Sequence, residues 1–264
     1  MASSRGRSGG SQRPGFRVVG EPAYVLHRYD WSETSLILDL FTRGHGRVAV
    51  VAKGAKRPYS QLRPVLMPFQ RLLASFGSRD EDAAEVHTLR AADWAGGGAM
   101  LTGSALLTGF YLNELLMKLL ARADAHPVLF DAYALTLPHL TSADEQQVQA
   151  ALRAFELTLL RELGVLPELG IVTLTMEPVL PAKGYLLHGE FGVRAGRIGE
   201  SAAIGGATLA ALQEALDEGS LLALQQACAE ALPELKSALR ALLHYHLGTP
   251  VLRTRQLMME LQQK

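Results

Sequence analysis

The sequence predicts an α+β protein in which a small β-barrel precedes a mainly α-helical domain with a small irregular β insertion. In the first third of the chain, short runs of β-branched and aromatic residues alternate with turns that contain glycine. After the triple glycine at 96–98, leucines recur at the three- and four-residue spacing of a helix. The change of period at this linker marks the boundary between the two parts.

Five short strands are expected before the linker. They cover Ala23–Arg28, Ser35–Phe41, Arg47–Ala52, Gln70–Phe76 and Glu85–Leu89. The second and third strands flank a short turn that contains glycine, as in a β-hairpin. Five strands so close together favour a closed barrel, because closure leaves no strand edge unpaired. The strand count fits an SH3-like barrel as well as an OB-fold, so the pattern alone leaves both open.

Helices are expected after the linker. Apolar residues share a face over 112–119 and again over 152–163, and two more helices are expected from Ala207 onward. The last of these begins at Pro233, because proline suits the first turn of a helix, and it ends at Gly248.

The stretch 170–197 interrupts this helical pattern. It contains two prolines, several glycines and short apolar runs, which indicate an irregular β insertion. The expected domains are a flexible basic tail over 1–15, a barrel over 16–95 and a helical domain over 96–264 that contains the insertion.

The net charge is zero, but the charges are unevenly distributed. Residues 1–90 hold 14 Lys and Arg against 8 Asp and Glu, a net charge of +6, and residues 91–264 hold 12 against 18, a net charge of −6. A basic N-terminal third is typical of proteins that bind polyanions such as nucleic acids. Small imbalances are also common in other proteins, so charge alone leaves the partner open.

The composition argues against several classes of protein. Hydrophobic residues make up 48% and charged residues 20%, which is ordinary for a globular protein. No stretch has the roughly 18 uninterrupted apolar residues that a membrane-spanning helix needs, and residues 1–14 lack the apolar core of a secretory signal. The single cysteine, Cys228, cannot form an internal disulfide, so a reducing cytoplasm is expected.

No pattern of catalytic residues is present in the sequence. It lacks the glycine spacing of nucleotide-binding loops, and no Gly-x-Ser-x-Gly elbow stands between an expected strand and an expected helix, as it does in hydrolases. His244 and His246 would point about 200° apart on a helix, so they do not readily share a metal ion. Cys228 is expected to be a small buried apolar residue. We therefore expect no enzymatic activity, no cofactor and no metal.

Basic and aromatic residues gather around the predicted strands. The cations are Arg28, Lys53, Lys56, Arg57, Arg63 and Arg71. The rings are Tyr29, Trp31 and Tyr59. A barrel that binds nucleic-acid strands needs cations along the phosphates and rings on which bases stack. The alternative is that the cations occupy a solvated face and the rings pack the barrel.

Several segments of the chain together resemble the RecO family of bacterial recombination mediators. They are Val25–Ser35 (VLHRYDWSETS), Leu38–Thr42, Gly46–Val48, Val51–Arg57 (VAKGAKR), Leu66–Gln70 (LMPFQ), Tyr111–Leu116 (YLNELL), Leu152–Leu157 (LRAFEL) with Leu163 and Gly164, Leu247–Pro250 (LGTP) and Leu252–Arg255 (LRTR). Each segment is weak alone, but they occur in family order and span nearly the whole chain after residue 16.

The resemblance implies an OB-fold followed by a helical domain with a small insertion. It also implies binding to single- and double-stranded DNA and annealing of complementary strands. In the mediator role that it implies, the protein acts with RecR to help load the RecA recombinase onto strands coated by the single-strand-binding protein (SSB). Such a protein works without cofactor-dependent catalysis, in the cytoplasm at the nucleoid.

The sequence departs from the family pattern at the insertion. Many members carry a four-cysteine zinc site there, but residues 170–197 contain no cysteine. The chain therefore resembles the zinc-free branch, in which packing and not metal must hold the insertion together.

The resemblance also implies site residues. The lysine–glycine segment matches the family's DNA-binding barrel loop, so Lys53, Lys56 and Arg57 are expected to contact phosphates. The wider DNA-binding set adds Arg28, Tyr59, Arg63 and Arg71. On the helical domain, Arg153 is expected to pair with the carboxylate of the acidic, apolar SSB tail. The apolar walls of that groove are expected from Leu112, Leu116, Phe155 and Leu159, for which packing in the helical core is the alternative.

Two other functions stay open. A protein-binding assembly scaffold without DNA binding predicts that charge reversal at Lys53, Lys56 and Arg57 leaves DNA binding unchanged. A hydrolase that uses the scattered histidines predicts turnover that depends on one of them, and nothing in their spacing favours it.

Overall fold

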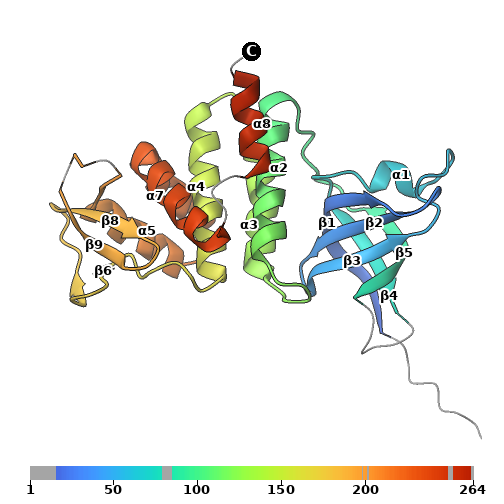
Figure 1. The fold of residues 1–264 in the computed structure, drawn as a ribbon, viewed down its shortest axis with the longest axis horizontal. Coiled ribbons are helices and arrows are strands. Elements are labelled where there is room, and N and C mark those ends of the chain that lie inside the picture. Colours follow the sequence, from blue (N-terminus) through green and yellow to red (C-terminus); the bar gives the residue numbers. More distant parts are fainter. Residues whose placement is uncertain (1–15, 79–84, 198, 201, 249–251, 263–264) are drawn as a thin grey trace, which may run out of the picture.

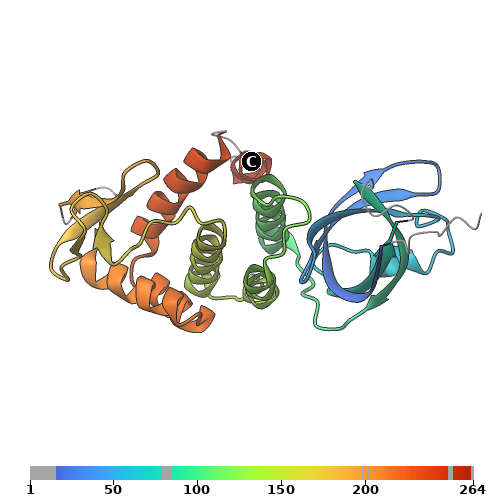
Figure 2. The ribbon, with the colours of Figure 1, turned by 90° about the horizontal axis from the view of Figure 1, so that it is seen from below.

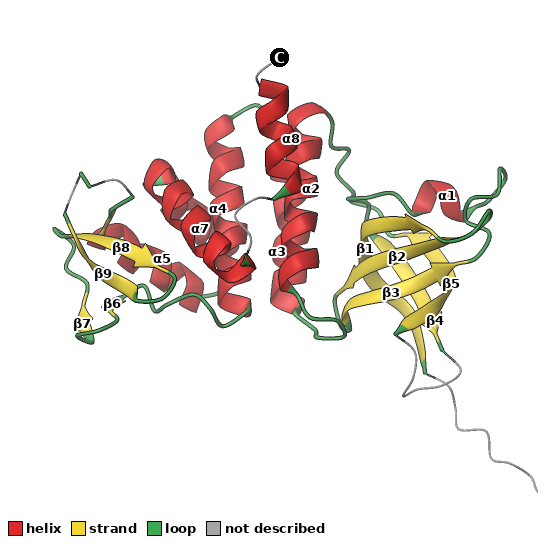
Figure 3. Cartoon of the chain, in the orientation of Figure 1, coloured by secondary structure: helices red, strands yellow, loops and turns green. Residues whose placement is uncertain are grey.

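The computed structural model describes residues 16–78, 85–197, 199–200, 202–248 and 252–262. Along the chain these residues form a β-barrel, then a group of helices, and small sheets packed beside the later helices (Figure 1). Coloured by secondary structure, most of the helices lie between two β regions at opposite ends of the molecule (Figure 3). The predicted α+β class is confirmed. The tail predicted over 1–15 lies outside the described residues.

Five strands close the N-terminal barrel. They are β1 (Arg17–Asp30), β2 (Leu36–Thr42), β3 (Gly46–Ala52), β4 (Leu72–Gly77) and β5 (Val86–Trp94), with the short helix α1 (Leu62–Val65) between β3 and β4. Their order around the barrel is β1-β2-β3-β5-β4, and β3 and β5 run parallel. This crossover gives the Greek-key arrangement of an OB-fold. It confirms the OB-like barrel over the SH3-like barrel that the strand count also allowed.

The first strand is longer than the sequence predicted. The prediction began at Ala23, after Gly20 and Pro22, which are unfavourable inside a regular strand. In the structure β1 pairs with β4 over its first half and with β2 over its second, and its register shifts between Val18 and Glu21 and between Val25 and His27. Such irregularities bend a strand, so one strand can take part in both halves of a barrel.

Seven helices follow the linker within the described residues. They are α2 (Gly103–Leu119), α3 (Pro127–His139), α4 (Glu145–Glu162), α5 (Gly206–Asp217), α6 (Leu221–Ala229), α7 (Leu232–Leu247) and α8 (Arg253–Gln262). The sequence predicted helices that correspond to α2, α4, α5 and α7, but it missed α3, α6 and α8. Helix α3 buries Leu129, Phe130, Tyr133 and Leu137, which do not leave one clean polar face to detect. Helix α8 has apolar residues at Leu257, Met259 and Leu261, but all three are exposed, so no buried face marks this short helix.

The predicted insertion forms small sheets. Its strands are β6 (Ile171–Val172), β7 (Glu177–Pro178), β8 (Gly184–His188), β9 (Gly192–Gly196) and β10 (Ile204–Gly205). Strand β8 lies between β10 and β9, and Tyr185, Val193 and Ile204 are buried in the same core as the helices. The hydroxyl oxygen of Tyr185 accepts a hydrogen bond from the Leu180 amide at 2.7 Å. The residues present fit an insertion held by packing and do not fit a four-cysteine zinc site.

Four aromatic rings join the barrel to the helices. Tyr24 of β1 and Phe41 of β2 point away from the barrel interior and pack against Phe130 and Tyr133 of α3. The ring centroid of Tyr24 lies 5.4 Å from that of Phe130 and 5.0 Å from that of Tyr133. All four rings are buried, and they belong to the hydrophobic core of the helical domain. The barrel wall therefore rests directly on the helices (Figure 2).

Polar contacts fix the register of this junction. The side-chain amide of Asn113 on α2 donates to the carbonyl of Leu26 at 3.0 Å and accepts from the Tyr133 hydroxyl at 2.6 Å. Nearby, the buried carboxylate of Asp39 faces the guanidinium groups of Arg122 and Arg47, at 3.1 Å and 3.7 Å. A buried amide with both ends occupied tolerates only one arrangement of its partners.

We expect Asn113→Ala to lower the free energy of unfolding by about 2–4 kcal/mol, because it leaves the Leu26 carbonyl and the Tyr133 hydroxyl buried without a partner. Urea denaturation measures this change, and Ser104→Ala, at an exposed position of the same helix, is the control. Equal stability of Asn113→Ala and Ser104→Ala would show that the amide does not hold the junction.

Candidate nucleic-acid interface

The loop between β3 and α1 carries the densest group of exposed cations in the predicted DNA-binding set. Lys53, Lys56 and Arg57 are exposed, and Arg63 follows them on α1. Gly54, between the first two, has a left-handed backbone (φ 72°) that favours glycine, so the chain turns sharply there. Within the described part of the chain, Lys53, Arg57 and Arg63 have no ion-pair partner. Their charges are therefore available to an external anion.

Lys56 connects this loop to the loop between β1 and β2. Its ammonium group forms an ion pair with Asp30 at 3.0 Å and donates to the Ser32 carbonyl at 3.1 Å, and its backbone amide donates to the Thr34 carbonyl at 3.0 Å. The two loops therefore lie side by side at one end of the barrel (Figure 1). Lys56 thus compensates Asp30 at the end of β1, and among the described residues Glu33 is the carboxylate of the β1–β2 loop without an ion-pair partner.

The predicted aromatic residues are exposed. Tyr59 is 95% exposed on the β3–α1 loop, Trp31 is 64% exposed on the β1–β2 loop, and Tyr29 is 42% exposed near the end of β1. The alternative that these rings pack the barrel interior is therefore wrong, since Phe76, Leu38 and Leu40 fill that space. Trp31 and Tyr59 therefore occupy the same pair of loops as Lys53, Lys56 and Arg57, while Tyr29 lies on β1.

Three predicted DNA-binding cations lie outside this pair of loops, and the first of them, Arg63, is on α1 directly after the β3–α1 loop. Arg28 of β1 donates to the Leu66 carbonyl at 3.4 Å, at the end of α1. Arg71 is half-buried just before β4, and its charge acts on Tyr24, which packs at the junction with the helices. The structure thus brings together Lys53, Lys56, Arg57, Tyr59 and Arg63, and it places Arg71 toward the junction.

The predicted peptide-binding arginine is in a buried polar cluster. Arg153 of α4 is 7% exposed, and its guanidinium lies 3.0 Å from the carboxylate of Glu156, which is fully buried. The Tyr111 hydroxyl donates to the same carboxylate at 2.6 Å. Burial raises the pKa of Glu156, while the charge of Arg153 and the Tyr111 hydrogen bond oppose that shift. Sequence reasoning missed Glu156 and Tyr111, although Glu156 stands one helical turn from Arg153.

The residues expected to line the peptide groove are core residues in this conformation. Leu112, Leu116, Phe155 and Leu159 are fully buried between α2, α4 and their neighbours. Their role in peptide binding stays a prediction, and the structure gives them a packing role. Beside the cluster, burial and the charge of Arg240 lower the pKa of Arg255 on α8. Arg153, Arg240 and Arg255 thus supply more positive charge than Glu156 balances.

Glu114 of α2 holds the beginning of α8. Its carboxylate accepts hydrogen bonds from the amides of Arg253 and Thr254 at 2.9 and 3.0 Å, and from the Thr254 hydroxyl at 2.7 Å. Lys118 adds an ion pair at 3.4 Å. Partial burial acts to raise the pKa of Glu114, but these hydrogen bonds together lower it below its usual value. The carboxylate thus serves as an N-cap supplied by another helix.

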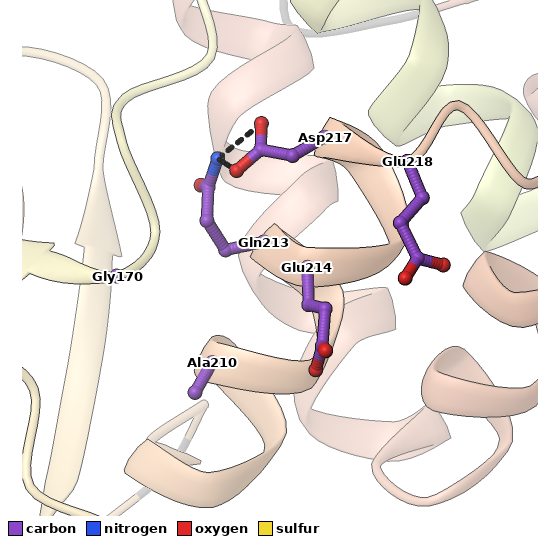
Figure 4. A pocket seen from close by; sticks show the side chains of 6 residues that line it. All are labelled: Gly170, Ala210, Gln213, Glu214, Asp217 and Glu218. Atoms are coloured by element: carbon purple, nitrogen blue, oxygen red, sulfur yellow. Dashed lines mark hydrogen bonds between the residues drawn. The ribbon is translucent and has the colours of Figure 1, made fainter.

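A shallow pocket on α5 shows no ligand chemistry of its own. Gly170, Ala210, Gln213, Glu214, Asp217 and Glu218 line it (Figure 4). The Asp217 carboxylate accepts from the Gln213 amide at 3.0 and 3.1 Å and pairs with Arg161 at 3.0 Å. The Asp217 carboxylate is therefore already bound by groups of the protein itself. No helix in the described ranges has the length and apolar character needed to cross a membrane.

The five-stranded barrel joined to a helical domain belongs to the class of OB-type barrels, many of which bind oligonucleotides or oligosaccharides. Comparison with known proteins gives the family. Residues 17–96 match the model "Recombination protein O N terminal" and residues 100–256 match "Recombination protein O C terminal". The chain therefore belongs to the RecO family of DNA repair proteins.

Two relatives illustrate the similarity. The chain is 54% identical over 247 residues to the DNA repair protein RecO of Polaromonas naphthalenivorans (strain CJ2), an alignment that covers 93% of this chain and 98% of that protein. It is 51% identical over 247 residues to the DNA repair protein RecO of Verminephrobacter eiseniae (strain EF01-2), covering 93% and 97%. The similarity thus extends over both domains.

We expect Glu114→Gln to loosen α8 by roughly 1 kcal/mol at neutral pH, the usual worth of an N-cap. Because the folded pKa of Glu114 is lowered, its contribution is present above the ordinary pKa of 4.5 and is lost as the pH falls through the folded value. Hydrogen exchange of the α8 amides at pH 7 and below pH 4 measures both effects. Glu145→Gln, at an exposed position of α4, is the control. A mutant-to-wild-type difference that did not shrink in acid would contradict this role.

Proposed function

We propose that this protein is a recombination mediator that binds DNA through the β3–α1 loop and anneals complementary strands. The observation that carries the proposal is a set of exposed cations on an OB-type barrel, Lys53, Arg57 and Arg63, which form no ion pair with any residue that the structure describes. Contacts from such cations to phosphates do not depend on base sequence and weaken with salt. Annealing follows when the protein screens the repulsion between two strands and leaves the base edges free to pair.

The proposal includes protein partners. Binding of the acidic, apolar SSB tail would bring the mediator to strands coated by SSB, and RecR would act with it to help load RecA. This role needs binding surfaces and no catalytic residues, and it belongs in the cytoplasm at the nucleoid. The membership of the chain in a DNA repair family and the excess of positive charge around Arg153 support these assignments.

We predict that Lys53→Glu/Lys56→Glu/Arg57→Glu abolishes annealing of complementary oligonucleotides coated with SSB. Each lost phosphate contact should also reduce the slope of log affinity against log salt by about one unit. Fluorescence quenching of labelled strands measures annealing, and anisotropy at several salt concentrations measures the slope. Arg90→Glu/Lys183→Glu/Arg194→Glu is the control with the same change of charge, since these three exposed cations lie on β5 and on the insertion, away from the β3–α1 loop.

The possible results distinguish DNA binding at the loop from a protein-binding scaffold. Loss in the loop variant alone, with an unchanged unfolding curve, supports DNA binding at the loop. Equal loss in both variants would mean that only overall charge matters. No DNA binding by the wild type at low salt would favour a protein-binding scaffold.

We predict a second effect at Arg153, on binding of a labelled acidic peptide with a free C-terminal carboxylate. Arg153→Met/Glu156→Gln should weaken binding roughly 10- to 100-fold, the worth of one charge-assisted hydrogen bond. Replacing both partners avoids a buried carboxylate without its cation, which would destabilise the helix bundle. An amidated peptide should bind both proteins weakly. Equal affinity of the variant and the wild type for the free carboxylate would remove Arg153 from the peptide site.

A further inference from the structure

Two exposed rings occupy adjacent loops at one end of the barrel. Trp31 directly follows β1, and Tyr59 lies between β3 and α1, yet Lys56 ties their loops together through Asp30, Ser32 and Thr34. Large rings exposed singly are ordinary, but two on neighbouring loops beside free cations are not explained by packing. An aromatic face in water gains free energy when another flat apolar face covers it.

The charges around these rings select the partner. Lys53 and Arg57, on the same loop as Tyr59, have no ion-pair partner among the described residues. Lys56 compensates Asp30, so Glu33 is the one acid of the two loops that opposes them. A partner that offers flat apolar faces together with regular negative charge is a single-stranded nucleic acid. In a duplex the base faces are already covered by their neighbours, so rings on loops cannot reach them.

We propose that Trp31 and Tyr59 form a stacking platform for unpaired bases, with Lys53 and Arg57 on the flanking phosphates. The platform rests on the proposed DNA-binding function and adds selectivity for single strands. A nucleotide that is bound through the face of its base and through its phosphate leaves the base-pairing edge exposed to solvent. The platform therefore lets the protein hold a strand in a form that a complementary strand can pair with.

Intrinsic fluorescence provides the first test. The chain has two tryptophans, Trp31 and Trp94, so Trp94→Phe leaves Trp31 as the single reporter. Titration of this variant with an oligo-dT single strand should strongly quench its emission, because stacking on a base brings the indole into contact with another π-system. A duplex of the same length should quench it little. The matched control is Trp31→Phe, in which Trp94 reports and neither DNA should change the emission.

Affinity provides the second test. Trp31→Ala/Tyr59→Ala should weaken binding of single-stranded oligo-dT by about tenfold or more, in line with the stacking contribution of a base on a ring. Affinity for duplex should stay within about twofold, since the phosphate contacts remain. Both side chains are exposed, so the variant should keep the unfolding curve of the wild type. Oligo-U should behave like oligo-dT, because stacking uses only the base face.

The outcomes distinguish the platform from DNA binding in general. The platform is overturned if single-stranded DNA binds without quenching Trp31 and if Trp31→Ala/Tyr59→Ala binds it with the affinity of the wild type. That result leaves the proposed function in place. Equal loss for single strands and duplex also overturns it, because the rings would then act on the backbone. Loss of SSB or RecR binding with DNA affinity intact would reassign the rings to a protein contact. Failure of the wild type to bind any DNA overturns both proposals.

Discussion

The packing of the barrel wall against α2 and α3 determines how the rest of the molecule is arranged. Tyr24 and Phe41 turn their rings outward from the barrel, and Phe130 and Tyr133 receive them in the core of the helical domain. Asn113 then fixes the register through one bond to the barrel backbone and one to Tyr133. Because this wall is covered, the loops at the end of the barrel are left free for a ligand. The barrel and the helices therefore act as one scaffold with separate surfaces.

The junction also divides the cations of the basic N-terminal third into two groups. Arg43 and Arg47 face carboxylates at the junction, Asp131 and Asp39, so their charges are compensated within the protein. Lys53 and Arg57 have no such partner in the described residues and stand on a solvated loop. A count of charges along the sequence gives both groups equal weight, but only the second presents a field to a polyanion. The excess of six positive charges in the first third thus overstates what a DNA strand would meet.

The sequence was most informative where local pattern and tertiary structure agree. The strands around Leu38 and Val50 are rich in apolar and β-branched residues and flank a turn with glycine, and α4 and α7 have apolar residues at helical spacing, so these elements could be predicted. Helix α8 could not, because its position comes from a carboxylate on α2, a contact between residues about 140 positions apart. The exposure of Trp31 and the burial of Arg153 could not be predicted from the sequence either. Whether a ring or a guanidinium is buried depends on the elements that pack above it, which residue spacing does not specify.

The burial of Arg153 has a consequence for any partner that binds there. Its guanidinium already faces Glu156, and Tyr111 shares that carboxylate, so an incoming carboxylate must compete with an internal one. Burial disfavours the charged form of Glu156, which weakens the internal competitor, while Arg240 and Arg255 keep the local charge positive. A cluster with surplus cations and a destabilised internal anion favours exchange of that anion for an external one. The same burial means that a peptide reaches Arg153 only where the side chains above it move aside. The proposed peptide binding at Arg153 would therefore be coupled to the packing of the helical core, whereas the proposed DNA binding at the barrel loops would require no rearrangement of the core.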